Sequence, residues 1–208
     1  MNTTPISPPD LPTSDDVQPQ IDATARIPAS GERALVLGGG GSTGNAWLIG
    51  VVAGLFDAGL DVTTADLTIG TSAGATAAAQ LAGATPPELL AATLAATPPQ
   101  RGPVGGVPTR PAPDHLEKFR SIIAASDDVA DMRRRMGAAA LDTDAASDGS
   151  GQARWRATVA SRLPSEDWPR RTVLITAVDA HTGEPVVFDR HSGIDLVDAV
   201  AASTSPMR

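Results

Sequence analysis

Two glycines flank a serine in the segment 70–74 (GTSAG), and this is the feature that most restricts how the chain can fold. The segment follows the apolar run 67–69 (LTI) and precedes an alanine-rich run. Where a strand meets a helix in this way, the serine lies on a sharp turn that exposes its hydroxyl at the edge of a sheet. The first N–H groups and the positive dipole end of the helix face the same point and favour an oxyanion there. The pattern predicts that Ser72, between the motif glycines Gly70 and Gly74, is a nucleophile, with a purely structural turn as the alternative.

Four consecutive glycines begin a second motif, 38–44 (GGGGSTG), which lies between a short apolar run and a stretch that is apolar nearly all round. Gly39, Gly41 and Gly44 satisfy the pattern G-x-G-x-x-G between a strand and a helix, where backbone N–H groups can approach an anion. Four glycines in a row exceed what a tight turn requires, and each adds to the entropy lost on folding. The run therefore favours an anion or oxyanion role. Together with Ser72 it makes a serine-dependent acyl hydrolase the main hypothesis.

Two strand, glycine-turn and helix units in succession place both turns at the carboxyl edge of a mostly parallel sheet, so the sequence predicts an α/β fold. Thr85 and Glu88 form a capping-box pattern at the start of a helix that reaches about Ala96. Strands are expected at 33–37, 67–69, 172–178 and 185–188, the last two as a hairpin-like pair. Further helices are expected at 114–136, 154–163 and 195–203, and irregular segments at 97–113 and 142–151.

The first 30 residues are rich in Pro, Ser, Thr, Asp and Gln and have no periodic apolar face. Such a segment cannot bury enough surface to offset its ordering entropy, which predicts a disordered tail over 1–30 and one folded domain over 33–208. Hydrophobic residues make up 41% of the chain but aromatic residues only 3%. The core is therefore expected to consist of Ala, Val, Leu and Ile, with helices packed closely on small side chains.

Charge and composition exclude several function classes. The formal net charge of −8 argues against a nucleic-acid partner, which requires a basic face, and the arginines at 133–135 are interpreted as a solvated helix face. The chain has no cysteine, and its three histidines lack the spacing of a zinc site, so neither a metal nor a cofactor is expected. The sequence shows neither a signal-peptide core nor an apolar run of about 18 residues. These features predict a cytoplasmic protein and leave peripheral membrane contact open.

The two glycine motifs, in this order and spacing, resemble those of the patatin-like phospholipase family of bacterial type. The resemblance runs from about Ala34 to the end of the chain and includes the segments 175–188 and 199–203. It implies a three-layer α/β/α fold with a mostly parallel central sheet. It also implies hydrolysis of lipid acyl esters, of phospholipase A, lysophospholipase or carboxylesterase type, by a serine–aspartate dyad.

The family mechanism assigns roles to residues of both motifs. The resemblance implies that Ser72 attacks the ester carbonyl and that backbone N–H groups of Gly39, Gly40 and Gly41 stabilise the oxyanion. Water would then release the acyl group from the enzyme. The expected partner is a lipid or ester substrate.

Two departures from the family pattern change these expectations. The family usually has a basic residue in the glycine loop where this chain has Thr43, which favours a plain carboxylester or lysolipid substrate. The family's catalytic Asp lies in an Asp-Gly motif downstream of a segment like 201–206, and the sequence has no such motif there. We therefore expect the chain to be truncated relative to the family and its activity to be impaired. A non-catalytic remnant of the family is the alternative.

Two further hypotheses come from other enzyme classes. Ser72, Asp179 and His191 follow the chain order of an α/β-hydrolase triad, although solvated surface residues are the more common explanation of Asp179 and His191. A dinucleotide-binding domain built on the G-x-G-x-x-G pattern would need an acidic residue at the end of the second strand. Asp61 and Asp66 instead precede that strand.

Overall fold

The computed structural model describes residues 32–96, 115–145 and 150–205. The expected tail over 1–30, the expected loop over 97–113 and positions 146–149 of the irregular segment expected over 142–151 lie outside these ranges. The elements in chain order are β1 (Ala34–Leu37), α1 (Gly41–Asp57), the 3-10 helix η2 (Val62–Thr64), β2 (Leu67–Thr71), α2 (Ala73–Gly83), α3 (Pro86–Ala95), α4 (His115–Ala125), α5 (Val129–Ala145), α6 (Ser150–Ala160), β3 (Thr172–Val178), β4 (Pro185–Phe188) and α7 (Leu196–Ser203).

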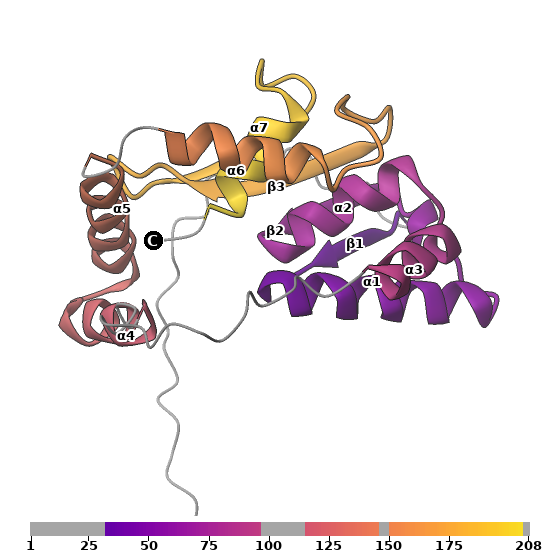
Figure 1. Cartoon of the computed structure of the whole chain (residues 1–208), viewed down its shortest axis with the longest axis horizontal. Coiled ribbons are helices and arrows are strands. Elements are labelled where there is room, and N and C mark those ends of the chain that lie inside the picture. The colour runs from indigo at the N-terminus through magenta and orange to yellow at the C-terminus, as the bar shows by residue number, and fades with distance from the viewer. Residues whose placement is uncertain (1–31, 97–114, 146–149, 206–208) are drawn as a thin grey trace, which may run out of the picture.

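The four strands form one sheet in the order β1-β2-β3-β4 (Figure 1). The first three strands are parallel, and β4 pairs with β3 in the antiparallel direction. Leu37 at the end of β1 lies opposite Gly70 of β2, so the carboxyl ends of these two strands are neighbours at one edge of the sheet. The chain is therefore an α/β protein with a mostly parallel open sheet, as predicted, and the expected hairpin of β3 and β4 is confirmed.

Helix α2 lies against the first three strands, and α7 lies against β3. Helix α1 packs on α2 and α3, while α6 packs on α7 (Figure 1). Apart from Pro86, the buried apolar side chains of the described residues are Ala, Val, Leu or Ile, which confirms the predicted core composition. Ala75, Ala77 and Ala78 of α2 are fully buried, and their small size lets the backbone of α2 approach the sheet closely.

A capping box begins α3 as predicted. The Glu88 carboxylate accepts hydrogen bonds from the Thr85 backbone N–H at 2.9 Å and from the Thr85 hydroxyl at 2.6 Å. These two bonds lower the pKa of Glu88, the hydroxyl bond having the larger effect. The side chain thus satisfies a donor that a helix start leaves without an intrahelical partner.

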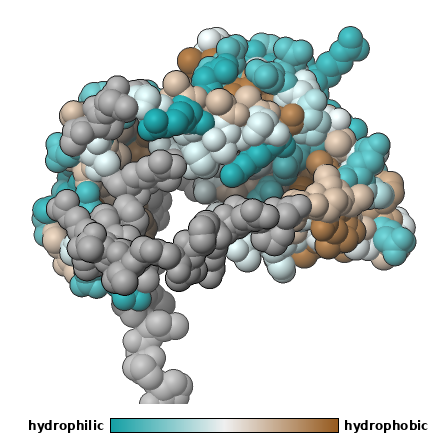
Figure 2. All heavy atoms as spheres, viewed as in Figure 1, coloured by the Kyte–Doolittle hydropathy of each residue, from teal (hydrophilic) through white to brown (hydrophobic). Residues whose placement is uncertain are grey.

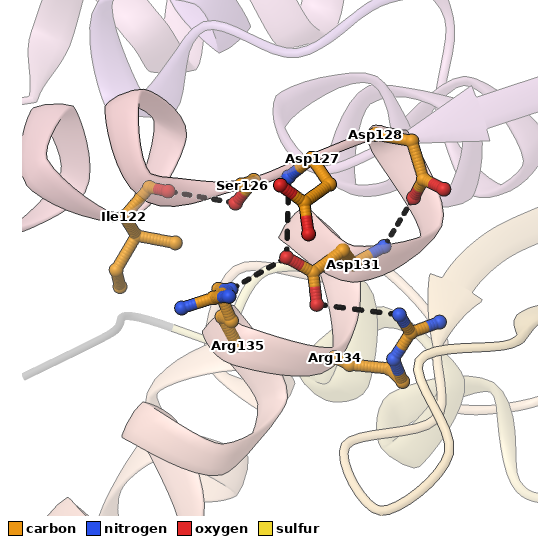
Figure 3. Close-up of polar contacts among 7 residues, drawn as sticks. All are labelled: Ile122, Ser126, Asp127, Asp128, Asp131, Arg134 and Arg135. Atoms are coloured by element: carbon orange, nitrogen blue, oxygen red, sulfur yellow. Dashed lines mark hydrogen bonds and ion pairs between the residues drawn. The ribbon is translucent and has the colours of Figure 1, made fainter.

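The prediction of a single helix over 114–136 is wrong, because the chain breaks between α4 and α5 (Figure 3). The Ser126 hydroxyl donates to the carbonyl oxygen of Ile122 at 2.7 Å, and the Asp128 carboxylate accepts from the backbone N–H of Asp131 at 2.6 Å. Such side-chain bonds compete with the helical backbone ladder and end one helix while capping the next.

Two other boundaries also differ from the prediction. Helix α5 continues to Ala145, so the segment 142–145 is helical where a polar loop was expected. Helix α6 begins at Ser150 and ends at Ala160, and not at the expected 154 and 163. Small and polar side chains occur both in helices and in loops, so their pattern in the sequence does not determine where a helix ends.

Helix α5 also contacts the turn between β3 and β4, which corrects part of the interpretation of residues 133–135. Arg133 donates from Nε to the carbonyl oxygen of Gly183 at 2.8 Å. A side chain at Gly137 would overlap the carbonyl of Ala180 in the same turn. Arg133 therefore fixes α5 to the hairpin and is not part of a solvated face.

The Asp131 carboxylate bonds Arg135 at 2.6 Å and Arg134 at 3.2 Å (Figure 3). The hydrogen bond from Arg135 is the main cause that lowers the pKa of Asp131 below its ordinary value of 3.8. A carboxyl whose folded pKa is lowered stabilises the fold above its unfolded pKa, and this contribution is lost as pH falls through the folded value.

We expect Asp131→Asn to lower the midpoint of thermal unfolding at pH 7 by an amount that stays constant down to about pH 5. The difference from wild type should shrink as pH falls below 3.8. Thermal unfolding followed by circular dichroism measures it, with Asp142→Asn as a control that removes an exposed carboxylate from the same helix. A difference that is independent of pH would contradict this account.

Candidate functional site

Ser72 lies between the last residue of β2 and the first residue of α2, where the sequence predicted a sharp turn. Its φ is 53° and its ψ is −116°, and it is the one non-glycine residue of the described ranges with a positive φ. Such a conformation costs about 1–3 kcal/mol and persists only where the surrounding structure imposes it. Because strain of this kind gathers at functional sites, Ser72 is the candidate functional residue of this turn.

The two motif glycines explain how the turn is possible. A Cβ at Gly70 would lie 2.6 Å from the carbonyl oxygen of Gly74 and 2.7 Å from the Cα of Ala75. A Cβ at Gly74 would overlap the carbonyl oxygen of Leu37 at the end of β1. Both positions therefore exclude any side chain, since α2 folds back against the ends of β1 and β2.

The glycine loop after β1 lies directly beside Ser72. A Cβ at Gly39 would lie 3.6 Å from the Cβ of Ser72, and a Cβ at Gly44 would lie 3.6 Å from the Cβ of Ala73. Gly40 has a φ of 153°, and a Cβ there would lie 2.8 Å from the Cα of Gly44. The close turn between β1 and α1 thus requires glycine and brings its backbone next to the Ser72 side chain.

Two helix N-termini converge on Ser72 as a result. Helix α1 begins at Gly41 and helix α2 at Ala73, and the first N–H groups of each have no intrahelical acceptor. Asn45 of α1 fixes the two helices together, because its Nδ2 donates to the carboxamide oxygen of Gln80 at 3.0 Å and to the carbonyl oxygen of Ala73 at 3.5 Å. The combined dipoles favour negative charge at this point.

Ser203 is a residue of this site that the sequence did not reveal. Its hydroxyl accepts a hydrogen bond from the backbone N–H of Ser72 at 2.8 Å, across 131 positions of the chain. Beside it, the hydroxyls of Thr71 and Thr176 bond each other across β2 and β3 at 2.7 Å. A single serine or threonine so far away carries no local pattern, so only the fold identifies these contacts.

The structure does not assemble the triad of Ser72, Asp179 and His191. Residue 72 follows β2 at the carboxyl edge of the sheet, whereas β4 is antiparallel and leads His191 toward the amino end of β3. There Arg190 donates to the carbonyl oxygen of Arg170 at 3.0 Å and to Nε2 of His191 at 3.0 Å.

The Asp179 carboxylate is occupied within its own turn. It accepts hydrogen bonds from the backbone N–H groups of His181 at 2.8 Å and Thr182 at 2.9 Å. These two bonds lower the pKa of Asp179, and the bond from Thr182 has the larger effect. More generally, no carboxylate or imidazole within the described ranges hydrogen-bonds to the Ser72 hydroxyl.

The acidic residues considered for a dinucleotide also have other partners. The Asp61 carboxylate accepts from the backbone N–H of Thr63 at 2.9 Å and begins η2. The Asp66 carboxylate accepts from the backbone N–H of Arg33 at 2.8 Å. Strand β2 ends in Thr71, which bonds Thr176, so no acidic group stands where a ribose hydroxyl would bind.

A separate cavity of about 570 Å³ lies between α5, α6 and α7. Trp155 and Arg156 of α6 line it, together with Asp198 and Ala201 of α7. Side chains two positions apart on a helix point about 200° apart, so Ala201 faces this cavity while Ser203 faces Ser72. Ala202 and Ser205, on either side of Ser203 in the chain, also line the cavity.

No protein-family profile, curated protein or solved structure matches this chain. Among the described residues there is no group of three His, Asp or Glu side chains that could hold a metal ion. None of the described helices has the length and hydropathy needed to cross a membrane. Only the geometry of the site therefore indicates which chemistry it could perform.

Replacing Gly74 by alanine tests the close approach of α2 to β1. We expect Gly74→Ala to lower the free energy of unfolding by at least about 2 kcal/mol, because the new methyl group meets a backbone carbonyl that cannot move freely. Gly54→Ala is the matched control, since apart from the nearby backbone of its own helix no atom lies within 4 Å of a Cβ at this exposed position of α1. It should stabilise the fold by about 0.5–1 kcal/mol. Equal effects of the two substitutions in urea unfolding would show that the close approach is absent.

Proposed function

We propose that this chain is a serine-dependent acyl hydrolase of the patatin-like phospholipase kind, with Ser72 as its nucleophile. The observation that carries the proposal is the positive φ of Ser72 beside the glycine loop. The parallel arrangement of β1, β2 and β3 and the helices packed on them are compatible with the three-layer α/β/α fold of that family. The order of the glycine loop and the serine turn along the chain also supports the proposal.

The reaction begins when the Ser72 Oγ attacks the carbonyl carbon of an ester. A C–O bond forms, the hydroxyl proton passes to a hydroxide ion from solvent, and the electrons of the C=O π bond move to the carbonyl oxygen, which becomes an oxyanion. Backbone N–H groups of Gly39, Gly40 and Gly41 and the start of α2 stabilise this charge, because they are fixed in place before the reaction. Collapse of the intermediate expels the alcohol and leaves an acyl-enzyme, which water hydrolyses.

The substrate we favour is a neutral or weakly charged ester with an apolar acyl chain. Trp47 lies in the second turn of α1, about 9 Å along the helix from Gly41, and is 66% exposed. Further apolar side chains are exposed over α1 and α3, among them Leu94, which is 77% exposed (Figure 2). Thr43 provides no charge for a phosphate, so a carboxylester or lysolipid suits the loop better than an anionic headgroup. Peripheral contact with lipid through the same apolar side chains belongs to this proposal.

Labelling by a fluorophosphonate tests the proposal, because this reagent phosphonylates an activated serine and releases fluoride. We expect wild type to be labelled and Ser72→Ala to lose the label. Ser42→Ala, which removes an exposed hydroxyl from the glycine loop, should retain it. Label that persists in Ser72→Ala, or a folded wild-type chain that takes none, would contradict the proposal and favour a non-catalytic relative of the family.

The pH dependence of the labelling rate tests how the hydroxyl loses its proton. Since no described carboxylate or imidazole bonds to Ser72, we expect solvent hydroxide to serve as the base. The second-order rate constant should then rise about tenfold per pH unit between about pH 6 and 9. A plateau above about pH 5 would instead reveal a carboxylate base outside the described residues.

A further inference from the structure

Ser203, the last residue of α7, is joined to the candidate nucleophile by one hydrogen bond. Its Oγ lies 2.8 Å from the backbone nitrogen of Ser72 and accepts that N–H. Both side chains are half-buried. The contact connects the end of the seventh helix to the turn that begins the second.

The hydrogen bond satisfies the backbone N–H of Ser72 in the strained turn. Thr71 is the last residue of β2 in register with β3, where it lies opposite Thr176. Ser72 follows this last paired residue, so its N–H needs a partner outside the ladder, and an unsatisfied backbone donor would cost about 1–3 kcal/mol. The Ser203 hydroxyl supplies the acceptor that the ladder no longer provides.

The Ser203 hydroxyl belongs to a helix that is packed firmly in the core. Leu196, Val197 and Val200 of the same helix are at most 1% exposed and belong to the core. Helix α7 packs on β3 and on α2, which are the strand and the helix next to the serine turn. A displacement of Ser203 would therefore need a displacement of the core.

We propose that Ser203 is a positioning residue, whose hydroxyl fixes the backbone of Ser72 and so directs the Ser72 Oγ toward the bound ester. This inference rests on the hydrolase function proposed above. It also assigns the oxyanion donors: the Ser72 N–H is occupied by Ser203, so the N–H groups of the glycine loop and of Ala73 remain for the substrate oxygen. Fixing a reacting group within a fraction of an ångström is worth large factors in rate.

Three substitutions at the end of α7 test the role. Ser203→Ala removes the acceptor, and Ser203→Thr keeps a hydroxyl at the same place. Thr204→Val is the matched control, because the Thr204 hydroxyl bonds only within its helix, to the carbonyl oxygen of Val200 at 2.6 Å. Thermal unfolding of each full-length variant shows whether the fold is retained.

The first measurement is hydrogen exchange of the Ser72 amide, followed by NMR. We expect Ser203→Ala to raise its exchange rate about tenfold or more, with Ser203→Thr and Thr204→Val within about threefold of wild type. If Ser203→Ala does not fold, the wild-type protein still decides the matter. A Ser72 amide as protected as those of β2 supports the hydrogen bond, and an unprotected one overturns it.

The second measurement is the fluorophosphonate rate constant of the same variants. Ser203→Ala should react about 10- to 100-fold more slowly at unchanged thermal stability, and Ser203→Thr should recover to within about threefold. Equal rates for wild type and Ser203→Ala would overturn the positioning role while the hydrolase proposal stands. A wild-type chain without reactivity would overturn the hydrolase proposal itself, and the positioning role with it.

Discussion

The backbone of α2 lies directly against the ends of β1 and β2, with no side chain between them. The rest of this structure depends on this contact. Because Gly70 and Gly74 carry no Cβ, the first turn of α2 lies against the carbonyl oxygen of Leu37. That approach leaves Ser72 no extended conformation and brings it against the loop that follows β1. The position of the hydroxyl, the two helix N-termini and the neighbouring glycine N–H groups all follow from this one packing contact.

The strain of about 1–3 kcal/mol at Ser72 is retained because several elements oppose its release. Buried alanines hold α2 on the sheet, and relaxation of the turn would open this core. Asn45 fixes α1 to α2 on one side, and Ser203 fixes the turn to α7 on the other. Contacts with α1, α2 and α7 leave the serine turn little freedom, and the proposed nucleophile needs this restriction to be preorganised for a substrate.

Local sequence features were predictable where the backbone itself imposes the residue type. Strands 172–178 and 185–188 are rich in apolar and β-branched residues and lie between turn residues, and the turn at Ser72 needs glycines that stand in the sequence. Contacts between distant residues were not predictable: Ser203 looks like any helix-end serine until the fold brings it to Ser72. The helix break at Ser126 was not predicted, because polar side chains fit an exposed helix surface as well as they fit a helix cap.

We propose that Ser72 and the glycine loop together form a nucleophile with its oxyanion site. A crystal structure of the phosphonylated protein tests this proposal most directly. We expect phosphorus bonded to Ser72 Oγ and a phosphonyl oxygen about 2.7–3.1 Å from backbone nitrogens of Gly39, Gly40 or Gly41. An adduct on another residue, or one on Ser72 whose oxygen points into solvent away from the loop, would contradict it.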